Sequence, residues 1–409
     1  MNKIELLAPG GDLEKLKIAI AYGADAVYFG GQDFSLRAGA GGLSFDEMKE
    51  GISFAHERGR KCYLTLNIFP HNEDIEPLKE YLTRLKGIQL DGILISDPGV
   101  FSLVKEYLPE IDLHLSTQAN MTNIEAAKFW RSMGVKRIVL ARELSLEEIK
   151  TIRNELPEDT ELEAFVHGAM CISYSGRCLL SSIMTGRDSN RGMCAHPCRY
   201  KYTLMEEKRP GEYYPIEEDG RGTYIMNSKD LCMIEHIPDL DKAGIASIKI
   251  EGRMKSIFYV ATVIGAYRRA LDSYYENPKD WKLDPEILKE LSKASHREFT
   301  TGFYYGKTTS QDQNYETSAY VKDYTFTGLV KDYNESSGYA VVEQRNKMEI
   351  GDKIEFFGPD GKSFSQVLTS MKDLESGEDL MSAPHAKQML LIKTEQPVSA
   401  NYLLRRKEK

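Results

Sequence analysis

The sequence predicts an α/β fold: a TIM-like (β/α)8 barrel with an inserted Cys-rich segment and a C-terminal small β-barrel domain. Three observations lead to this prediction. Short apolar runs alternate with amphipathic helical patterns over the first 160 residues. The alternation continues as far as a helical pattern at 258–275, which gives nine candidate strands. After about residue 315, short strands separated by turn residues replace that pattern.

The candidate strands are nearly continuous in apolar residues, which is typical of a parallel sheet covered by helices. A doubly wound sheet usually ends at about six strands, so nine candidates favour a closed eight-stranded barrel with one surplus strand. The pattern does not say which strand is surplus. The candidates are Ile4–Leu7, Ala26–Phe29, Lys61–Leu66, Gly92–Ile95, Asp112–Leu115, Arg137–Leu140, Glu161–Val166, Thr223–Met226 and Ser247–Ile250.

Helices are expected between these strands, because apolar residues recur there at helical spacing. Asp12, Ser44 and Ser145 are suitable N-caps, and glycines 23, 59 and 134 are suitable C-caps. The expected helices are Asp12–Tyr22, Phe45–Arg58, Ile75–Leu85, Asn123–Met133, Leu146–Leu156 and Phe258–Tyr275.

Two domains are expected. The barrel spans residues 1–315, and its irregular Cys-rich insertion spans 171–222, where a long loop is typical of a functional segment. The small β-barrel domain spans 320–409. Its expected strands are Tyr324–Val330, Gly338–Glu343, Lys353–Phe357, Gln388–Lys393 and Tyr402–Leu404.

Composition narrows the class of protein. A hydrophobic share of 41% in 409 residues supports a packed core and excludes a disordered chain. No apolar run reaches the roughly 20 residues of a membrane span, and the N-terminus lacks a signal-peptide core. We therefore expect a cytoplasmic protein with no membrane partner. The net charge of −9 disfavours non-specific nucleic-acid binding, although a local basic patch can still bind RNA.

Five of the six cysteines lie within 62 residues. Their spacing is Cys171-x6-Cys178-x15-Cys194-x3-Cys198, and Cys232 follows after 33 more residues. Such a cluster in a reducing compartment indicates a metal site or catalysis. The spacing favours an iron–sulfur cluster over structural zinc, because zinc sites usually have two short C-x2–4-C pairs. The remaining Cys62 lies within a predicted strand and is expected in the core.

The insertion is also basic. Residues 171–204 hold five basic residues and one acid, a net charge of +4, with interleaved tyrosines. Basic and aromatic side chains together are typical of sites for single-stranded RNA loops, although a solvated loop face gives the same pattern. The candidate RNA-binding residues are Arg177, Arg187, Arg191, Arg199 and Lys201.

Polar residues follow several of the predicted strands, where barrel enzymes place their active sites. Lys249 and Arg253 can bind a carboxylate or phosphate, or instead form an ordinary ion pair with Glu251. The candidate catalytic residues are Arg142, His167, Lys249, Glu251 and Arg253.

Several stretches, taken together, resemble the signature of the peptidase U32 family, and most closely its tRNA-hydroxylation branch. They are Leu7–Gly11, Glu163–Ser181, Asn190–Arg199, Asn227–Cys232, Lys249–Lys255 and Thr301–Gly306. The resemblance implies a protein that helps to convert the wobble uridine of tRNA to 5-hydroxyuridine. It also implies a [4Fe–4S] cluster, prephenate as precursor, the tRNA anticodon loop as partner and a related U32 partner subunit.

The resemblance implies cluster ligands at Cys171, Cys178 and Cys194. Family members differ between a fourth ligand at the position of Cys198 and one at the position of Cys232. We predict Cys232, because it follows a separate strand and can close the cluster from another side. A dianionic precursor needs one or two arginines, for which Arg142 and Arg253 are the candidates.

Two other functions remain open. One is a collagenase-like peptidase, after which the U32 family was named, although the chain has neither a His-Glu-x-x-His nor a Gly-x-Ser-x-Gly motif. The other is a zinc-stabilised RNA-binding module without catalysis. The metal content of the purified protein distinguishes the peptidase and the zinc-stabilised module from an iron–sulfur hydroxylation protein.

Overall fold

The computed structural model describes residues 3–35, 42–170, 178, 180–187, 194–195, 197, 203–205, 213–215, 229–306 and 320–408. Some predicted features lie outside these residues. They are the strand Thr223–Met226, the cysteines Cys171 and Cys198, and the basic residues Arg177, Arg191, Arg199 and Lys201.

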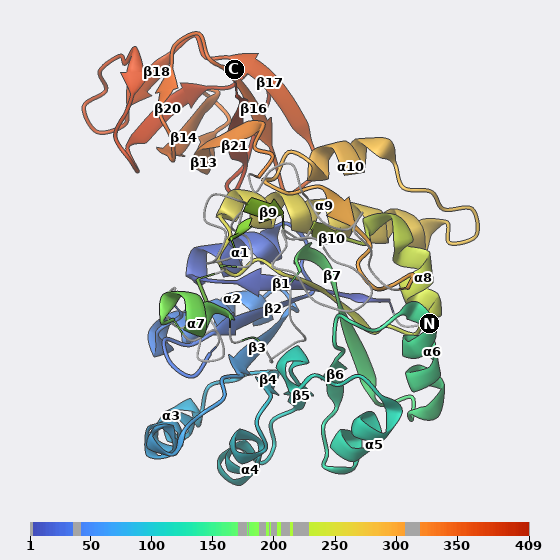
Figure 1. Cartoon of the computed structure of the whole chain (residues 1–409). Helices are drawn as coiled ribbons and strands as arrows, with labels where there is room; N and C mark the ends of the chain where they lie inside the picture. Colours follow the sequence, from blue (N-terminus) through green and yellow to red (C-terminus); the bar gives the residue numbers. More distant parts are fainter. Residues whose placement is uncertain are drawn as a thin grey trace.

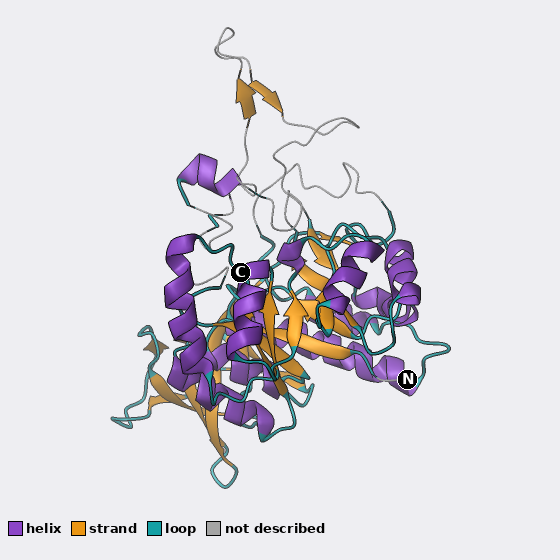
Figure 2. Cartoon of the chain, turned by 90° about the horizontal axis from the view of Figure 1, so that it is seen from below, coloured by secondary structure: helices purple, strands orange, loops and turns teal. Residues whose placement is uncertain are grey.

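Eight parallel strands close into a barrel, which confirms the predicted fold class (Figures 1 and 2). The last strand pairs with both the first and the seventh, so that Ser247 is opposite Glu5 on one side and Glu163 on the other. The eight described strands therefore close the barrel among themselves. The barrel strands are β1 (Glu5–Gly10), β2 (Ala26–Gly30), β3 (Lys61–Leu66), β4 (Gly92–Ile95), β5 (Leu113–Leu115), β6 (Arg137–Val139), β7 (Glu161–Ala169) and β11 (Ser247–Ile250).

Helices surround the strands (Figure 2). The predicted N-caps are confirmed, because the Asp12, Ser44 and Ser145 side chains each accept a backbone N–H of the first turn. The helices are α1 (Leu13–Ala21), α2 (Phe45–His56), α3 (Ile75–Leu85), α4 (Pro98–Tyr107), α5 (Ile124–Ser132), α6 (Leu146–Glu155), α8 (Ile237–Lys242), α9 (Ile257–Glu276) and α10 (Pro285–Leu291). Short 3-10 helices cover Asn72–Asp74, Thr117–Ala119 and Ile234–His236.

The insertion lies between β7 and α8. Its described elements include α7 (Leu180–Thr185) and a hairpin of β8 (Thr203–Met205) and β9 (Tyr213–Pro215). The strand β10 (Asp230–Cys232) then runs antiparallel to the end of β7, and β12 (Phe299–Thr300) pairs with β10. The sheet is therefore extended beside β7, at the carboxyl end of a barrel strand.

The C-terminal domain is a seven-stranded antiparallel sheet in the order β17-β16-β21-β13-β14-β20-β18, which forms half of a barrel. The expected strands are present. The additional β15, β17, β18 and β19 are short and partly polar, so their sequences gave little signal. The strands are β13 (Tyr324–Asn334), β14 (Tyr339–Gln344), β15 (Met348–Glu349), β16 (Lys353–Phe357), β17 (Ser363–Val367), β18 (Met371–Asp373), β19 (Ser382–Ala383), β20 (Met389–Lys393) and β21 (Leu403–Lys407).

The C-terminal sheet packs against the barrel domain beside α9 and α10 (Figure 1). Phe258 of α9 contacts the rings of Phe326 and Phe357 at centroid distances of 6.0 and 5.9 Å. The Tyr22 hydroxyl bonds to the carbonyl of Phe357 at 3.1 Å. The hydrophobic core of the barrel therefore continues into the C-terminal domain. Among the described helices, none combines the length and the apolar character that crossing a membrane requires.

Candidate active site at the barrel mouth

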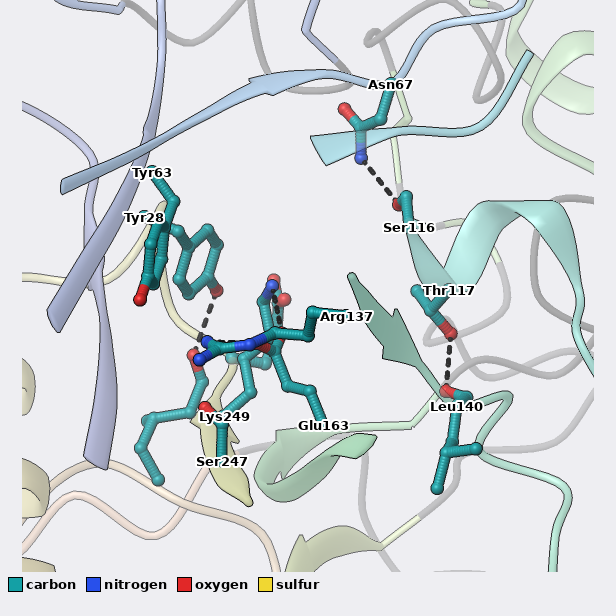
Figure 3. Close-up of polar contacts among 12 residues, drawn as sticks. Tyr28, Tyr63, Asn67, Ser116, Thr117, Arg137, Leu140, Glu163, Ser247 and Lys249 are labelled. Atoms are coloured by element: carbon teal, nitrogen blue, oxygen red, sulfur yellow. Dashed lines mark hydrogen bonds and ion pairs between the residues drawn. The ribbon is translucent and has the colours of Figure 1, made fainter. Parts of the chain in front are cut away.

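The carboxyl ends of the barrel strands carry a hydrogen-bonded polar layer (Figure 3). The Asn67 amide, just after β3, donates to the Ser116 hydroxyl at 3.2 Å. The Ser96 hydroxyl, just after β4, donates to the Asn67 carbonyl at 3.1 Å. Thr117 donates to the Leu140 carbonyl at 3.1 Å. The loops at this end are thereby held together, and a barrel of this type uses this end for binding and catalysis.

Arg142 and Glu251 are brought together at this mouth. Arg142 Nη1 donates to the Ala169 carbonyl at 2.8 Å, and Nη2 lies 3.8 Å from Glu251 Oε2. The guanidinium also lies over the Phe165 ring, 4.1 Å from its centroid. Arg142 Nε is buried without a hydrogen-bond partner in the described part of the chain. The arginine is thus oriented by its neighbours while one donor is left for a ligand.

Arg253 lies on the other side of the mouth, toward β2 and β3. Its side chain is buried, and Nη1 donates to the Thr65 hydroxyl at 3.0 Å. That hydroxyl donates in turn to the Phe29 carbonyl at 3.1 Å. Arg142 and Arg253 therefore both border the mouth, as the sequence predicts for a site that binds an anionic precursor.

His167 is not part of the open mouth. Its ring is buried among Tyr259, Tyr267 and Phe299, at centroid distances of 6.1, 5.6 and 5.7 Å. Burial, with smaller effects from His296 and Lys255, lowers the pKa of His167 to about 3. The imidazole is neutral at physiological pH, which disfavours a role in proton transfer. The catalytic role of His167 stays a prediction.

Lys249 lies in the barrel interior, where it forms an ion pair with Glu163 (Figure 3). Lys249 Nζ is 2.8 Å from Glu163 Oε1 and 4.2 Å from the centroid of the Tyr28 ring. Burial lowers the pKa of Lys249, and Glu163 opposes that shift. The ion pair expected with Glu251 is therefore made with Glu163 instead. This placement favours a structural role, and a catalytic role for Lys249 stays a prediction.

Three of the four predicted cluster ligands are described, and the segments that carry two of them, Cys178 and Cys194, meet at α7. Cys178 precedes this helix by two residues, and the backbone N–H of Ala195, next to Cys194, donates to the Ser181 hydroxyl at 3.0 Å. This bond links segments that are 14 residues apart in the sequence. The segments that carry the two cysteines are thus close to each other, and thiolates are the ligands that an iron–sulfur cluster takes. The described residues contain no group of three His, Cys, Asp or Glu side chains that could hold a metal, and Cys171 and Cys198 lie outside them.

Cys232, the predicted fourth ligand, is buried at the end of β10. Its Cα is opposite that of His167, four residues before Cys171 in sequence. Burial raises the pKa of the Cys232 thiol to about 11, and hydrogen bonds from Ile234 and Tyr267 oppose the shift. A ligand role would need this thiol to lose its proton, as every thiolate ligand must. The choice between Cys232 and Cys198 stays a prediction.

Of the candidate RNA-binding residues, only Arg187 is described, and its side chain is exposed. Two residues of the mouth, Ser35 and Thr65, were not predicted, because isolated hydroxyl residues carry little sequence signal. The glycine pairs Gly10-Gly11 and Gly30-Gly31 were the available signal. Glycine at the end of a strand often marks a place where another group approaches the backbone, and Arg253 does so here.

Acidification is expected to destabilise the protein through two buried histidines. His114 and His167 both have a lowered pKa, chiefly because of burial. The unfolded chain binds protons below a pH of about 6.5 and the folded chain does not, so stability is full above that pH and falls below it. Each histidine should contribute a loss of about 2 kcal/mol between pH 7 and 5. Urea denaturation should show this loss, and His114→Phe should remove about half of it. An unchanged pH dependence in that variant would contradict the prediction.

The fold and the site together define a class of protein: a (β/α)8 barrel with a cationic, hydroxyl-lined mouth and a cysteine-bearing insertion after its seventh strand. Comparison with known families then identifies the family. The model of peptidase family U32 matches residues 11–314, and that of the peptidase family U32 C-terminal domain matches residues 322–405. The chain therefore belongs to peptidase family U32.

Three relatives illustrate the range of this family. The chain is 42% identical to tRNA hydroxylation protein P1 of Bacillus subtilis (strain 168), over 99% of this chain and 95% of that protein. It is 38% identical to tRNA hydroxylation protein P of Escherichia coli (strain K12), over 99% and 96% of the two chains. A collagenase of Porphyromonas gingivalis (strain ATCC BAA-308 / W83) is 32% identical, over 88% and 87% of the two chains.

Proposed function

We propose that this protein is an enzyme of tRNA hydroxylation, which converts the wobble uridine to 5-hydroxyuridine with prephenate as precursor and an iron–sulfur cluster as cofactor. The observation that carries the proposal is full-length similarity to two tRNA hydroxylation proteins, at 42% and 38% identity over 99% of the chain. This function places the protein in the cytoplasm with tRNA, and a related U32 chain is a candidate partner subunit.

Arg142 and Arg253 would bind the carboxylates of the precursor. A guanidinium holds a carboxylate by directed, charge-assisted hydrogen bonds. Both arginines are largely buried and oriented by protein oxygens, namely the Ala169 carbonyl and the Thr65 hydroxyl. Glu251, 3.8 Å from Arg142, would repel a carboxylate placed beside it and so limit where the dianion can lie.

The cluster would be held by Cys171, Cys178 and Cys194, with Cys232 as the fourth ligand and Cys198 as its rival. The meeting of the Cys178 and Cys194 segments at α7 supports this assignment. When bound, a [4Fe–4S] cluster would supply an iron centre for electron transfer beside the barrel mouth. The chain's own residues would bind the precursor and, through Arg187 and its basic neighbours in the insertion, the anticodon loop.

The alternative is a collagenase-like peptidase, which the Porphyromonas gingivalis relative favours. A peptidase needs a nucleophile with an adjacent base or a metal-bound water. His167, which lies near the carboxyl end of β7, is enclosed by aromatic rings. This packing disfavours the peptidase.

Anaerobic purification and complementation test the proposed function together. The purified protein should absorb broadly in the visible range and contain about four iron atoms per chain. In cells that lack the activity, it should restore 5-hydroxyuridine in tRNA, and Arg142→Ala and Arg253→Ala should each lower that level at least about tenfold. Arg131→Ala, which removes an arginine paired with Asp159 just before the start of β7, at the end of the barrel opposite the mouth, is the matched control.

The outcomes separate the three functions. A colourless protein that holds zinc supports the RNA-binding module, and a metal-free protein that cleaves gelatin supports the peptidase. Unchanged hydroxyuridine in both arginine variants would contradict the precursor site. The iron content of the Cys232→Ala and Cys198→Ala variants assigns the fourth ligand. The protein should lose iron only when the cysteine that binds the cluster is replaced.

A further inference from the structure

The Ser35 hydroxyl is buried at the barrel mouth and makes no hydrogen bond. Ser35 follows the end of β2 by five residues, and 1% of its surface is exposed. Among the residues that the structure describes, its Oγ has no hydrogen-bond partner. A buried hydroxyl without a partner costs free energy, since it has given up water and gained nothing in return. Such a group at an active-site mouth indicates a partner that arrives with the ligand.

Gly30 allows the Ser35 hydroxyl and the Arg253 guanidinium to come close to each other. A Cβ atom at Gly30 would be 2.4 Å from Ser35 Oγ and 2.7 Å from Arg253 Nη1. The two polar atoms therefore converge over one glycine, and the sum of the two distances limits their separation to 5.1 Å. A residue larger than glycine would collide with both side chains, so glycine lets the two donors pack directly against the backbone of β2.

Arg253 is held in place before any ligand arrives. It is 8% exposed, and its Nη1 donates to the Thr65 hydroxyl at 3.0 Å. Its backbone is fixed as well, because a Cβ atom at Gly11 would be 2.0 Å from the Arg253 carbonyl oxygen. A charged group that is oriented in advance loses little entropy on binding.

We propose that Ser35 is a substrate-binding residue, and that its hydroxyl and the Arg253 guanidinium together bind one carboxylate of the precursor above Gly30. A planar carboxylate has two oxygens that accept hydrogen bonds, which matches one hydroxyl donor and one guanidinium edge. The identity of the precursor as prephenate rests on the proposed function. The carboxylate site itself rests on Ser35, Gly30 and Arg253.

Ser35→Ala tests this role by calorimetric titration of the iron-loaded protein with prephenate. The affinity should fall about tenfold, which corresponds to one lost hydrogen bond to a charged group. The unfolding temperature of the ligand-free variant should equal or exceed that of the wild type, because the orphan hydroxyl has been removed. A residue with a merely structural role would give the reverse: lower stability and unchanged affinity. That result would overturn the proposal.

Thr327→Val is the matched control. Thr327 also has a buried hydroxyl without a partner, but it lies on β13 of the C-terminal domain. Its replacement should leave the affinity for prephenate unchanged. If both variants lost affinity equally, the effect would be one of general packing and the proposal would fail.

Gly30→Ala is an independent test of the same position. The new methyl group would displace the ends of the Ser35 and Arg253 side chains, which can move without unfolding the protein. The affinity should fall by at least as much as in Ser35→Ala. The double variant should lose no more than Gly30→Ala alone, because both changes act on one carboxylate. Fully additive losses would show that the two residues act at different places.

Binding of succinate and of inorganic phosphate shows whether a negative result contradicts the Ser35 proposal or the proposed function. If prephenate binds and Ser35→Ala binds it equally well, only the Ser35 proposal fails. If wild-type protein does not bind prephenate, the precursor is wrong, and succinate then tests the carboxylate site. Weaker binding of succinate to Ser35→Ala supports the site, whereas equal binding or none overturns it. Tighter binding of inorganic phosphate than of either acid would also overturn the carboxylate assignment.

Discussion

Glu163→Gln is expected to lower the free energy of unfolding by about 3–5 kcal/mol. Glu163 is fully buried and pairs with two cations, Arg137 at 3.2 Å and Lys249 at 2.8 Å. Both cations are themselves almost completely buried. The substitution keeps the shape of the side chain but removes its charge, so Lys249 is left in the barrel interior without a carboxylate. Urea denaturation at neutral pH measures the loss.

Glu161→Gln is the matched control for this prediction. Glu161 also pairs with Arg137, at 2.6 Å, but 45% of its side chain is exposed. Water and salt screen such a pair, so its loss should cost less than about 1 kcal/mol. Equal losses in the two variants would show that burial does not determine the strength of this network.

Arg405→Ala is expected to destabilise the protein by about 3–5 kcal/mol and to uncouple the two domains. Arg405 is fully buried in β21, and its Nη2 donates at 2.8 Å both to Glu290 of α10 and to Glu355 of β16. Although burial raises the pKa of both carboxyl groups, hydrogen bonds from Arg405 hold their pKa values below the ordinary range. Without the arginine, two carboxylates would remain partly buried at the domain interface.

The role of Arg405 can be tested by scanning calorimetry of the Arg405→Ala variant. The variant should show an early transition for the C-terminal domain, separate from that of the barrel. Arg406→Ala is the control, because Arg406 is more exposed and pairs with Asp352 inside the C-terminal domain. It should cost less than about 1 kcal/mol. A single shifted transition in Arg405→Ala would contradict the predicted coupling role.

Local sequence patterns were sufficient to predict the elements of the barrel. The strand patterns are apolar runs, and several helices begin at a residue such as Ser44 or Ser145 whose side chain caps the first turn. These signals involve residues only three or four positions apart, so they can be recognised without knowledge of the tertiary contacts. The placement of Arg142 and Arg253 at the mouth follows in the same way, because both come after barrel strands.

The roles of the interior charges could not be predicted in this way. Lys249 resembled a ligand-binding cation in the sequence, yet it neutralises Glu163, which lies 86 residues away. Ser35 carried no signal at all until the fold placed it over Gly30 beside Arg253. In both cases the partner of a side chain depends on which strands become neighbours when the barrel closes.

The class of fold, the order of strands and helices, the resemblance to the U32 family and the clustering of cysteines can all be predicted from local patterns and spacings. Which charged side chains face the mouth and which are internal counter-ions becomes known once the folded chain shows their partners. The physical reason is that burial and pairing set the energy of a charged group, and both depend on residues far apart in the chain. Closure of β11 onto β1 and β7 is the step that brings these residues together.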